Sequence, residues 1–459
     1  MTREGVVDPS AFGLRAGIVV DGRLWEHAEA GRDDDEVTDR LFFARVVRVE
    51  PTLAAAFLDI GGGRTAFLTA RDARFLDPAR EKRRIQDLLR EGERLVVQGL
   101  READDDKGPR VTADIRLFGL FVIYRPYGGE VRVSGRVRGR EKAELHERAA
   151  RLFPDGRVVL RRFAVGVPDS VLREEAQRLE ELWRRIVREA AGAKPGPVAA
   201  AEDPFERILR FLFDREVERI AVAEGGLARR FEQALARIPE RVRPQLHRVP
   251  GLFAFDSTGI REQFEEALGP EVALPGGGRI VVEETRALCA VDVDGEGRDP
   301  LELDLEAARE VARQMRLRNI GGNIVVDFVD LPRPSARKLL DDALGKWFRD
   351  DPAGAQIHPM SALGLVHIAR ACRGRPLSRR WLAPCGACGG SGRVPSLAAR
   401  IEGLHREVVA ARRPVLALKV GERLAAALAP LAGAPWLAGI VPQVDPALPS
   451  DGFRLEFVP

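Results

Sequence analysis

The chain has 459 residues, of which 73 are Lys or Arg and 70 are Asp or Glu, giving a formal net charge of +3. This balance excludes nucleic-acid binding through bulk charge, so any such surface must be a local patch. No apolar run reaches the roughly 18 residues that a membrane helix needs, and the N-terminus lacks a signal peptide's apolar stretch. We therefore expect a cytosolic protein, long enough for about three or four domains.

The first predicted element is a β-hairpin near the N-terminus. The segment GIVVDGRLW, residues 17–25, has Asp21-Gly22 at its centre, a pair typical of a tight hairpin turn. An acidic stretch at residues 33–36 then marks a boundary. Residues 1–37 are too few to bury a core alone, so we expect them to pair with a later domain.

Residues 38–117 are predicted to form a small β-barrel. Short strands separated by turn signals are typical of the OB type, which binds single-stranded nucleic acid by stacking and charge. Phe57 and Phe67 are the candidate stacking residues, and Arg101 and Lys107 are the candidate phosphate contacts. The alternative is that both Phe side chains belong to the core, as aromatic residues on strands more often do.

The middle of the chain alternates strands and helices. Residues 118–200 are predicted to hold short strands and two helices, at residues 141–152 and 169–189. A segment rich in Ala, Gly and Pro, without periodicity and ending at Pro204, indicates a linker. Pro204 then suits the first turn of a helix, and the α/β pattern of residues 201–270 predicts a further subdomain.

Two apolar runs, residues 288–293 and 324–329, each carry an acidic residue among β-branched neighbours. A buried charge is costly unless it is paired or holds a cation. If the two strands are neighbours, Asp292 and Asp327 would converge at one edge of a sheet, with Asp294 on the face of Asp292. Two carboxylates on rigid strands suit Mg²⁺. The alternative is that each Asp caps a strand or starts a turn.

A basic helix is predicted between these strands, at about residues 304–318. Its apolar residues recur at helical spacing, and Gly321-Gly322 supplies the stop. Four arginines spread over its remaining surface: Arg309, Arg313, Arg316 and Arg318. Beside a carboxylate pair they would form a phosphate-facing wall, although ordinary solvation explains the same charges.

The close cysteine pair, Cys385 and Cys388, indicates metal binding in a reducing compartment. A redox CxxC is the alternative, but the pair lacks the usual strand-to-helix setting of that motif. One CxxC supplies two thiolates, whereas a structural zinc needs about four ligands. His367 or Cys372 would complete an intrachain set.

The run DVDG, from Asp292, followed by LDLEAAREVARQMRLRNIGGNIVVDFVDL, resembles the catalytic core of the ribonuclease E/G family. The resemblance implies a Mg²⁺-dependent endoribonuclease acting on single-stranded RNA, in RNA and rRNA processing or decay, with Asp292 and Asp327 as the metal-holding, catalytic carboxylates. AAAFLDIGGGRTAFL resembles the family's RNA-binding barrel at both Phe positions, and DDKG places Lys107 like its basic loop residue.

The resemblance also implies an α/β and α+β multidomain fold. Its expected parts are a ribonuclease-H-like subdomain with an OB-fold barrel inserted in it, a 5′-sensor-like domain, a DNase-I-like nuclease domain, a zinc link and a small C-terminal α+β domain. In that scheme residues 1–37 and 201–270 form the ribonuclease-H-like subdomain, and the other parts are residues 38–117, 118–200, 271–384, 385–394 and 395–459.

Several positions depart from the family pattern. Asp294 stands where the family usually has Asn. The Arg-Thr pair of the 5′-monophosphate pocket falls on Arg161 and Arg162, so a second guanidinium replaces the hydroxyl. In the stretch that ends at Arg373, the family has Glu, then Thr or Ser, and a second Arg. This chain has His367, Ala369 and Cys372 at those positions.

The remaining basic residues of that stretch, Arg370 and Arg373, are expected to contact the phosphates of the scissile strand. His367 is a candidate proton shuttle, although a lone His is more often structural. The changed positions support an alternative hypothesis, that the protein is a catalytically weak or inactive RNA-binding paralogue. A third is a phosphodiesterase acting on DNA or small nucleotides.

CGACGGSG, residues 385–392, resembles the family's zinc link, which implies a homodimer that shares Zn²⁺ between subunits, with a dimer of dimers as a further option. The tail is predicted to hold a helix at residues 396–411 and two strands. No long charge-rich extension follows in this sequence, so a degradosome scaffold is not expected.

Overall fold

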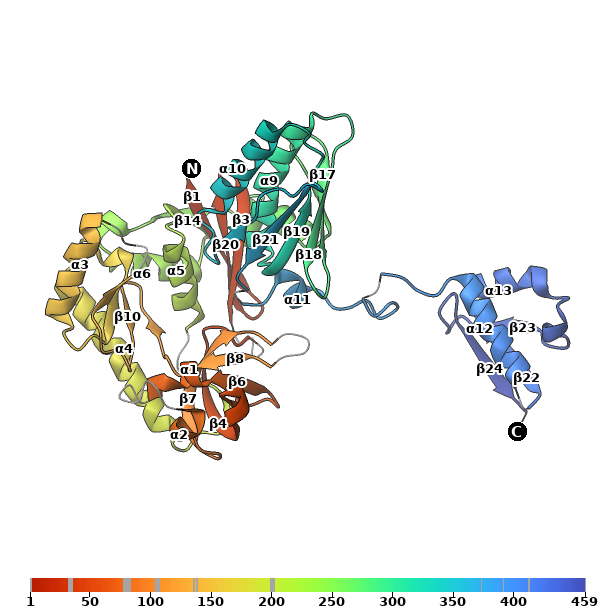
Figure 1. Ribbon diagram of the computed structural model, residues 1–459, viewed down its shortest axis with the longest axis horizontal. Coiled ribbons are helices and arrows are strands. Elements are labelled where there is room, and N and C mark those ends of the chain that lie inside the picture. Colours follow the sequence, from red (N-terminus) through yellow and green to blue (C-terminus); the bar gives the residue numbers. More distant parts are fainter. Residues whose placement is uncertain are drawn as a thin grey trace. The chain divides into compact units, whose positions relative to one another are not determined.

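The structure is a computed structural model, and it describes residues 2–31, 36–76, 84–103, 108–134, 137, 139–198, 203–372, 374–390, 392–411 and 413–458. The chain divides into two compact units, Met1–Leu382 and Ala383–Pro459. Among the described residues, the first unit contains four β-sheets and the second contains one (Figure 1). The mixed α/β multidomain class expected from the sequence is confirmed.

The first sheet joins the N-terminus to the middle of the chain. Strand β1 (Arg3–Ser10) lies between β2 (Gly13–Val20) and the distant β14 (Arg219–Ala223), to which it runs parallel. The sheet ends with β3 (Arg23–Gly31) on one side and β15 (Gln245–Val249) on the other. The expected hairpin and its pairing with a later segment are therefore confirmed.

Four helices belong to the segment around β14 and β15. Helix α5 begins at Pro204 behind an Asp203 N-cap and packs against β2 and β3. Aspartate at the N-cap followed by proline is a strong helix start. The helix bounds are α5 Pro204–Asp214, α6 Gly226–Ala236, α7 Ala254–Ser257 and α8 Arg261–Glu266.

The second sheet is a closed barrel. Its five strands follow the order β4-β5-β6-β8-β7, and pairing of β7 with β4 closes the ring, while the short β13 (Gly196–Pro197) adds to β4. The strand bounds are β4 Leu41–Glu50, β5 Ala55–Asp59, β6 Thr65–Thr69, β7 Arg94–Arg101 and β8 Arg110–Thr112. The short helices α1 (Ala70–Ala73) and α2 (Ile85–Leu88) accompany it. A closed five-stranded barrel agrees with the expected OB type.

The third sheet is small, in the order β11-β12-β10-β9. Its strands are β9 Leu117–Phe118, β10 Val122–Tyr124, β11 Arg132–Val133 and β12 Val158–Leu160, shorter than the sequence predicts. Helices α3 (Gly139–Leu152) and α4 (Asp169–Ala190) cover it, and both helix predictions agree within two residues. Strand β12 ends early because Arg162–Ala164 turn into a 3₁₀ helix.

The fourth sheet, which we call the carboxylate sheet, has six strands in the order β16-β17-β18-β19-β21-β20. Their bounds are β16 Glu271–Ala273, β17 Arg279–Glu284, β18 Cys289–Asp294, β19 Gly322–Asp327, β20 Ala355–Ile357 and β21 Leu365–Arg370. Helices α9 (Pro300–Leu317) and α10 (Pro334–Phe348) pack together on one side of it (Figure 1), and α11 spans Leu377–Trp381.

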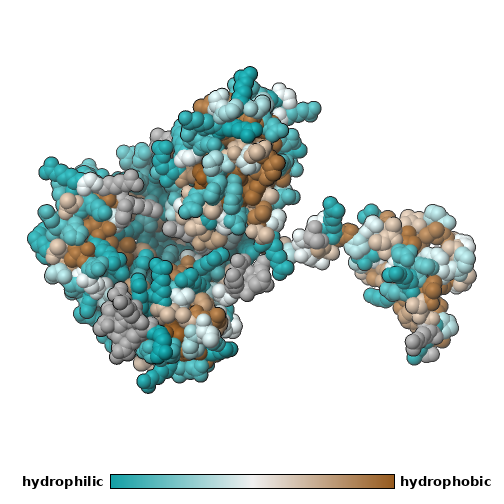
Figure 2. Space-filling view, in the orientation of Figure 1, coloured by the Kyte–Doolittle hydropathy of each residue, from teal (hydrophilic) through white to brown (hydrophobic). Residues whose placement is uncertain are grey.

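Alternation along these strands separates a covered face from an open face. Val291, Val293, Ile324, Val326, Val366 and Ile368 are buried in one apolar cluster with Ala308, Val311 and Met315 of α9. The residues between them point the other way and are more exposed. The face of the molecule seen in Figure 2 is largely hydrophilic, with apolar residues in smaller groups.

In its described residues, the second unit contains a three-stranded sheet and two α-helices. Strand β22 (Val415–Val420) lies between β23 (Pro442–Val444) and β24 (Phe453–Phe457). Helix α12 (Leu397–Ala410) begins behind a Ser396 N-cap, and α13 spans Glu422–Leu428. In neither unit does a described helix have the length and apolar character needed to cross a membrane.

Candidate active site

Asp292 and Asp327 lie side by side on the open face of the carboxylate sheet. Strands β18 and β19 are parallel neighbours, and their register places Asp292 directly opposite Asp327. Neighbouring strands are about 4.8 Å apart, and both side chains are exposed. The prediction that the two acidic strands are neighbours is confirmed. Two like charges at this spacing repel each other unless a cation lies between them.

The third acid of the open face is matched by a cation. Asp294 lies opposite Arg279 of β17, and the Arg279 Nη2 to Asp294 Oδ2 distance is 2.9 Å. Both side chains are about half exposed, so the pair is screened by solvent and contributes little to stability. The extra acid at this position therefore adds less negative charge to the centre of the face than the sequence suggests.

His367 lies on the same open face, on β21. It is opposite Val325, two residues from Asp327 along β19, which corresponds to about 7–8 Å between backbones. Its Nε2 is 3.3 Å from Asn323 Oδ1, and its ring stacks on His358 with centroids 5.4 Å apart. The imidazole is thus exposed and oriented by two neighbours.

The donor set fits Mg²⁺ and does not fit a site with many protein ligands. Within the described ranges, no group of three or more His, Cys, Asp or Glu side chains is arranged to hold a metal ion. Mg²⁺ keeps several of its waters and is usually bound by one or two carboxylates. Asp292 and Asp327 supply two hard oxygen ligands on rigid strands, which is such a set.

Arg370 does not lie where the sequence analysis expects it. Alternation puts it on the covered face, where its Nε donates to Asp351 Oδ2 at 2.6 Å and its Nη2 donates to Asp351 Oδ1 at 3.0 Å. It also donates to the carbonyl oxygen of Ile320. This placement corrects the expectation that Arg370 contacts the phosphates of the scissile strand. The guanidinium is buried and does not reach the open face.

The basic helix is also on the covered side, so its expected role as a phosphate-facing wall is wrong. Arg313 is buried and donates to Glu310 and to the Leu24 carbonyl oxygen of β3. Arg318 is buried and donates to Gln314. Arg313 and Arg316 join α9 to β3 of the first sheet, and Arg309 lies over the Trp347 ring of α10, so these side chains contact other elements and not the two aspartates.

Asp304, in the second turn of α9, is a buried acid that the sequence analysis does not single out. Its side chain is fully buried, its Oδ1 accepts from the Val329 N–H at 3.1 Å, and no donor within the described part of the chain reaches its Oδ2. Burial raises the pKa of Asp304 to about 7, partly offset by this hydrogen bond. Asp304 is at helical spacing from Ala307, Ala308 and Val311, which are all buried, and this spacing could have indicated that Asp304 is buried too.

The two barrel phenylalanines form a cross-strand pair. Phe57 of β5 lies opposite Phe67 of β6, with ring centroids 5.6 Å apart in an edge-to-face arrangement. Each is partly exposed between buried neighbours, so the pair faces outward from the barrel. Arg101 is exposed at the end of β7. The expected phosphate contacts Lys107 and Arg373 lie outside the described residues.

Both sensor-like arginines have carboxylate partners. Arg161 is buried, donates from Nη1 to the Gly119 carbonyl oxygen at 2.6 Å and forms an ion pair with Asp214. Arg162 forms a two-pronged pair with Glu216, whose second hydrogen bond, from Nη2, is 2.8 Å long. A phosphate at either guanidinium would have to compete with a carboxylate of this chain.

The cysteine pair belongs to the second unit. Cys385 precedes a turn in which the Gly389 N–H donates to the Cys385 carbonyl oxygen at 2.7 Å. Gly389 and Gly390 have φ of 59° and 91°, a left-handed conformation that favours glycine. Cys385 is exposed and Cys388 is partly exposed. The turn is compatible with two thiolate ligands, and any further ligands must come from elsewhere.

Comparison with known proteins finds matches over most of the chain. The model of the ribonuclease E/G family matches residues 116–373. Ribonuclease E of Synechocystis sp. is 32% identical over 377 residues, covering 78% of this chain and 55% of that protein. Ribonuclease G of Escherichia coli is 28% identical over 436 residues, covering 89% of this chain and 88% of that protein.

The chain belongs to the ribonuclease E/G family. It spans little more than half the length of the ribonuclease E from Synechocystis sp., whereas it covers most of the shorter ribonuclease G. The matched region contains the third sheet, the α5 to α8 segment and the whole carboxylate sheet, including Asp292 and Asp327.

Proposed function

We propose that this protein is an endoribonuclease that hydrolyses phosphodiester bonds in single-stranded RNA, in RNA processing or decay in the cytoplasm. The observation that carries the proposal is the direct pairing of Asp292 with Asp327 on an exposed sheet face. Family membership and the ribonuclease names of the relatives support it. In this proposal the carboxylate sheet is the DNase-I-like nuclease domain, and the first sheet with α5 to α8 is the ribonuclease-H-like subdomain.

Asp292 and Asp327 would hold the Mg²⁺ ion. When bound, that ion would orient a water as nucleophile and offset the charge that develops on the phosphate. The two strands fix both carboxylates before substrate arrives, so little reorganisation is needed. His367, oriented by Asn323 and His358, is the candidate donor of a proton to the leaving oxygen.

The barrel would bind the single-stranded RNA. Phe57 and Phe67 present adjacent ring surfaces, and stacking on an aromatic side chain contributes about 1–3 kcal/mol per base without regard to sequence. Arg101, at the end of β7, and Lys107 would contact phosphates. The aromatic pair thus supplies the single-strand preference, while the carboxylates supply the chemistry.

Cys385 and Cys388 would bind Zn²⁺ together with the same pair of a second copy, giving a homodimer. The glycine turn after the cysteines supports this part of the proposal, because it leaves both side chains near the surface. Zinc content and oligomeric state, measured before and after a chelator, test it independently of catalysis.

The test is cleavage of a fluorescent AU-rich single-stranded RNA by the Asp327→Asn variant, with and without Mg²⁺. Loss of one carboxylate should lower the rate by about 100-fold or more, and the parent protein should require Mg²⁺. Asp342→Asn is the matched control, because Asp342 is an exposed acid of α10. If Asp327→Asn cleaves the RNA as fast as the parent protein, the catalytic role proposed for Asp327 is wrong.

A specific observation favours the alternative of a catalytically weak RNA-binding paralogue. The basic residues expected to hold substrate phosphates, Arg370, Arg161 and Arg162, are each engaged by a carboxylate of the chain. This alternative expects salt-dependent RNA binding without Mg²⁺-dependent products. The same assay, with a DNA strand in parallel and identification of product ends, separates it from the nuclease and from a DNA-directed phosphodiesterase.

A further inference from the structure

A cavity of about 490 Å³ lies where strand β7 of the barrel meets α4. In Figure 1 the yellow helix α4 runs along the third sheet and down to the orange strands of the barrel. The volume is within the range of about 300–1,000 Å³ that small-molecule sites occupy. Among the described residues, its lining includes none from the carboxylate sheet, neither barrel phenylalanine and neither sensor-like arginine. The cavity is therefore separate from those sites.

The cavity lies between two apolar clusters. On the barrel side, Leu95 belongs to the cluster that fills the barrel, and Leu76 and Leu88 pack against that cluster. On the other side, Val96 and Trp183 belong to the large cluster shared by the first and third sheets. An apolar ligand in the gap would contact both clusters and would be removed from water, which is the main driving force for binding such ligands.

Two aromatic rings and an exposed valine contribute to the apolar lining. Tyr127 and Trp183 meet edge to face, with ring centroids 5.9 Å apart. Val187, one turn after Trp183 on α4, is 46% exposed although it lines the cavity. Burial raises the pKa of Tyr127, so its hydroxyl group stays protonated at neutral pH and adds no negative charge to the cavity. This wall therefore offers apolar surface that is still in contact with water.

Arg94, at the start of β7, supplies a positive charge to the lining. Its Nη1 donates to the Ala191 carbonyl oxygen at 3.1 Å, directly after the end of α4, and this neutral acceptor holds the guanidinium in place. No carboxylate of the described residues forms an ion pair with Arg94. Glu93, the acid of the lining, accepts from the Arg90 N–H at 3.0 Å. The charge of Arg94 is therefore available to a ligand.

Arg94 also lines a neighbouring cavity in which basic side chains predominate. The other cations of that cavity are Arg45, Arg64 and Lys194, and its acid is Asp59. Asp59 Oδ1 accepts from the Gly61 N–H at 2.9 Å, and Asp59 Oδ2 lies 3.8 Å from Arg45 Nη2. Four cations and one acid line this second cavity, so the electrostatic potential beside Arg94 favours a negatively charged group.

We propose that the cavity between β7 and α4 binds a small amphipathic anion, a medium-chain aliphatic carboxylate, with its chain between the two apolar clusters and its carboxylate on Arg94. A guanidinium binds a carboxylate through two parallel hydrogen bonds. Because the lining comes from both the barrel and α4, the bound ligand would hold these two parts of the chain together. The site includes neither Asp292 nor Asp327, so this binding and RNA cleavage are distinct properties.

The test is calorimetric titration of the full chain with octanoate, 1-octanol and octylammonium, which share one alkyl chain and differ in charge. Octanoate should bind saturably with a submillimolar Kd, and octylammonium should bind at least about tenfold more weakly. Octanol, which keeps only the apolar contacts, should bind with an affinity between the two. Arg94→Gln should weaken octanoate binding about tenfold and leave octanol binding unchanged, because only the carboxylate uses the guanidinium.

Arg90→Gln is the matched control, because Arg90 is an exposed arginine just before β7 that lines neither cavity. It should bind octanoate like the parent, as should Asp327→Asn, which separates this site from the proposed nuclease. Val187→Gln, at an exposed position of the apolar lining, should weaken octanoate and octanol binding alike. The proposal is overturned if octanoate does not saturate the parent protein, if octylammonium binds as tightly as octanoate, or if Arg94→Gln binds octanoate like the parent.

Discussion

The two faces of the carboxylate sheet differ in whether their charged groups are neutralised. On the covered face, Arg370 is held by Asp351, and Asp304 has a pKa raised to about 7. On the open face, Asp292 and Asp327 lie opposite each other and exposed, and no described cation pairs with them. The same six strands therefore carry neutralised charge on one side and unbalanced acid on the other.

The difference follows from what water can do for each face. A buried charge must be paired or lose its charge, because the low-dielectric interior does not solvate it. An exposed acid has no such requirement, so two adjacent carboxylates persist there at the cost of mutual repulsion. Asp294, which does have a cationic partner in Arg279, shows that the open face can neutralise an acid locally. Binding of a divalent cation is therefore expected to be most favourable at Asp292 and Asp327, where the negative charge is not balanced.

The largest effect is expected on the covered face, at Asp351. Asp351→Ala leaves the buried Arg370 without its carboxylate, and removing one partner of a buried ion pair typically costs about 3–5 kcal/mol. Chemical denaturation at pH 7 should show the loss in the free energy of unfolding. Asp350→Ala, at the exposed neighbouring acid, is the control and should change stability little. Equal stability of both variants would mean that the covered face does not need its ion pair.

A smaller and pH-dependent effect is expected at Asp304. Because the folded state raises the pKa of Asp304 from 3.8 to about 7, the folded chain holds one more proton than the unfolded chain between these values. Stability contributed by the neutral form is present below about pH 4 and is lost as the pH rises through 7. Asp304→Asn removes this loss, so it should stabilise the protein at pH 8 by about 1–3 kcal/mol, and much less near pH 4.

Denaturation of Asp304→Asn at several pH values between 4 and 8 measures this. Asp342→Asn, on exposed α10 surface, should show a pH-independent difference from the parent. A gain from Asp304→Asn that is constant with pH, or that grows toward acid, would contradict a proton on the buried carboxyl group.

The smallest effect is expected at Asp294 on the open face. Asp294→Asn removes only an acid that is half exposed and already paired with Arg279, so the Mg²⁺-dependent cleavage rate should change less than about threefold. Steady-state cleavage over a range of Mg²⁺ concentrations gives this comparison. A loss as large as that of Asp327→Asn would mean that Asp294 is itself a metal ligand.

Local patterns predicted the elements of the sheet but not all of their orientations. Period-two alternation identified β18 and β19 and placed both aspartates on one side, which the register confirms. The same alternation along β21 gives Arg370 the parity of Val366 and Ile368, so the sequence already indicated that Arg370 faces the core. The expectation that Arg370 contacts substrate phosphates followed the family resemblance and did not take this alternation into account.

Helix α9 shows a similar limit. Its apolar spacing was read correctly, but its start at Asp299-Pro300 was set four residues late, although an Asp N-cap and a following Pro are strong start signals. The burial of Arg313 and Arg318 was not predictable from the helix alone. It depends on β3, a strand nearly 300 residues earlier in the chain, packing against this helix.

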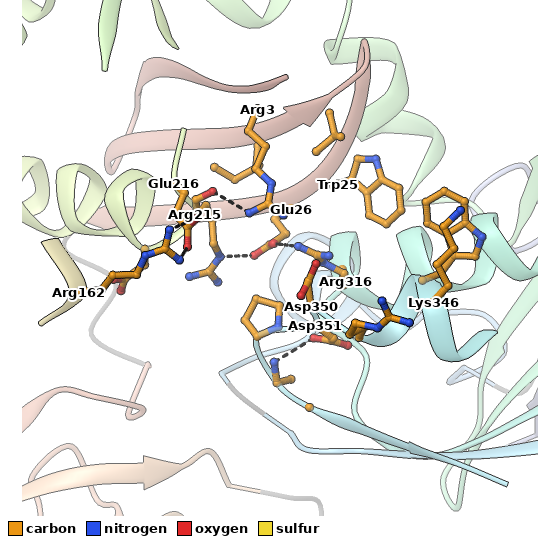
Figure 3. A pocket seen from close by; sticks show the side chains of 18 residues that line it. Arg3, Trp25, Glu26, Arg162, Arg215, Glu216, Arg316, Lys346, Asp350 and Asp351 are labelled. Atoms are coloured by element: carbon orange, nitrogen blue, oxygen red, sulfur yellow. Dashed lines mark hydrogen bonds and ion pairs between the residues drawn. The ribbon is translucent and has the colours of Figure 1, made fainter. Parts of the chain in front are cut away.

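Structural features formed by segments far apart in the sequence could not be predicted from local sequence patterns. Strand β1 pairs with β14, 215 residues away in the sequence. Its own sequence has too few apolar residues to predict a strand. One cavity of the first unit is lined by Arg3, Arg215, Arg316 and Lys346 (Figure 3), which come from four separate segments of the chain. Such sites arise from tertiary packing and need coordinates to be seen.

Mn²⁺ titration followed by electron paramagnetic resonance, without RNA, tests whether Asp292 and Asp327 share one ion. Mn²⁺ accepts the same carboxylate and water ligands as Mg²⁺. We expect the parent and Asp294→Asn to bind one ion at this face, whereas Asp292→Asn and Asp327→Asn should each bind it at least about tenfold more weakly. Binding that is unchanged in both single variants, or lost in only one of them, would contradict a shared ion.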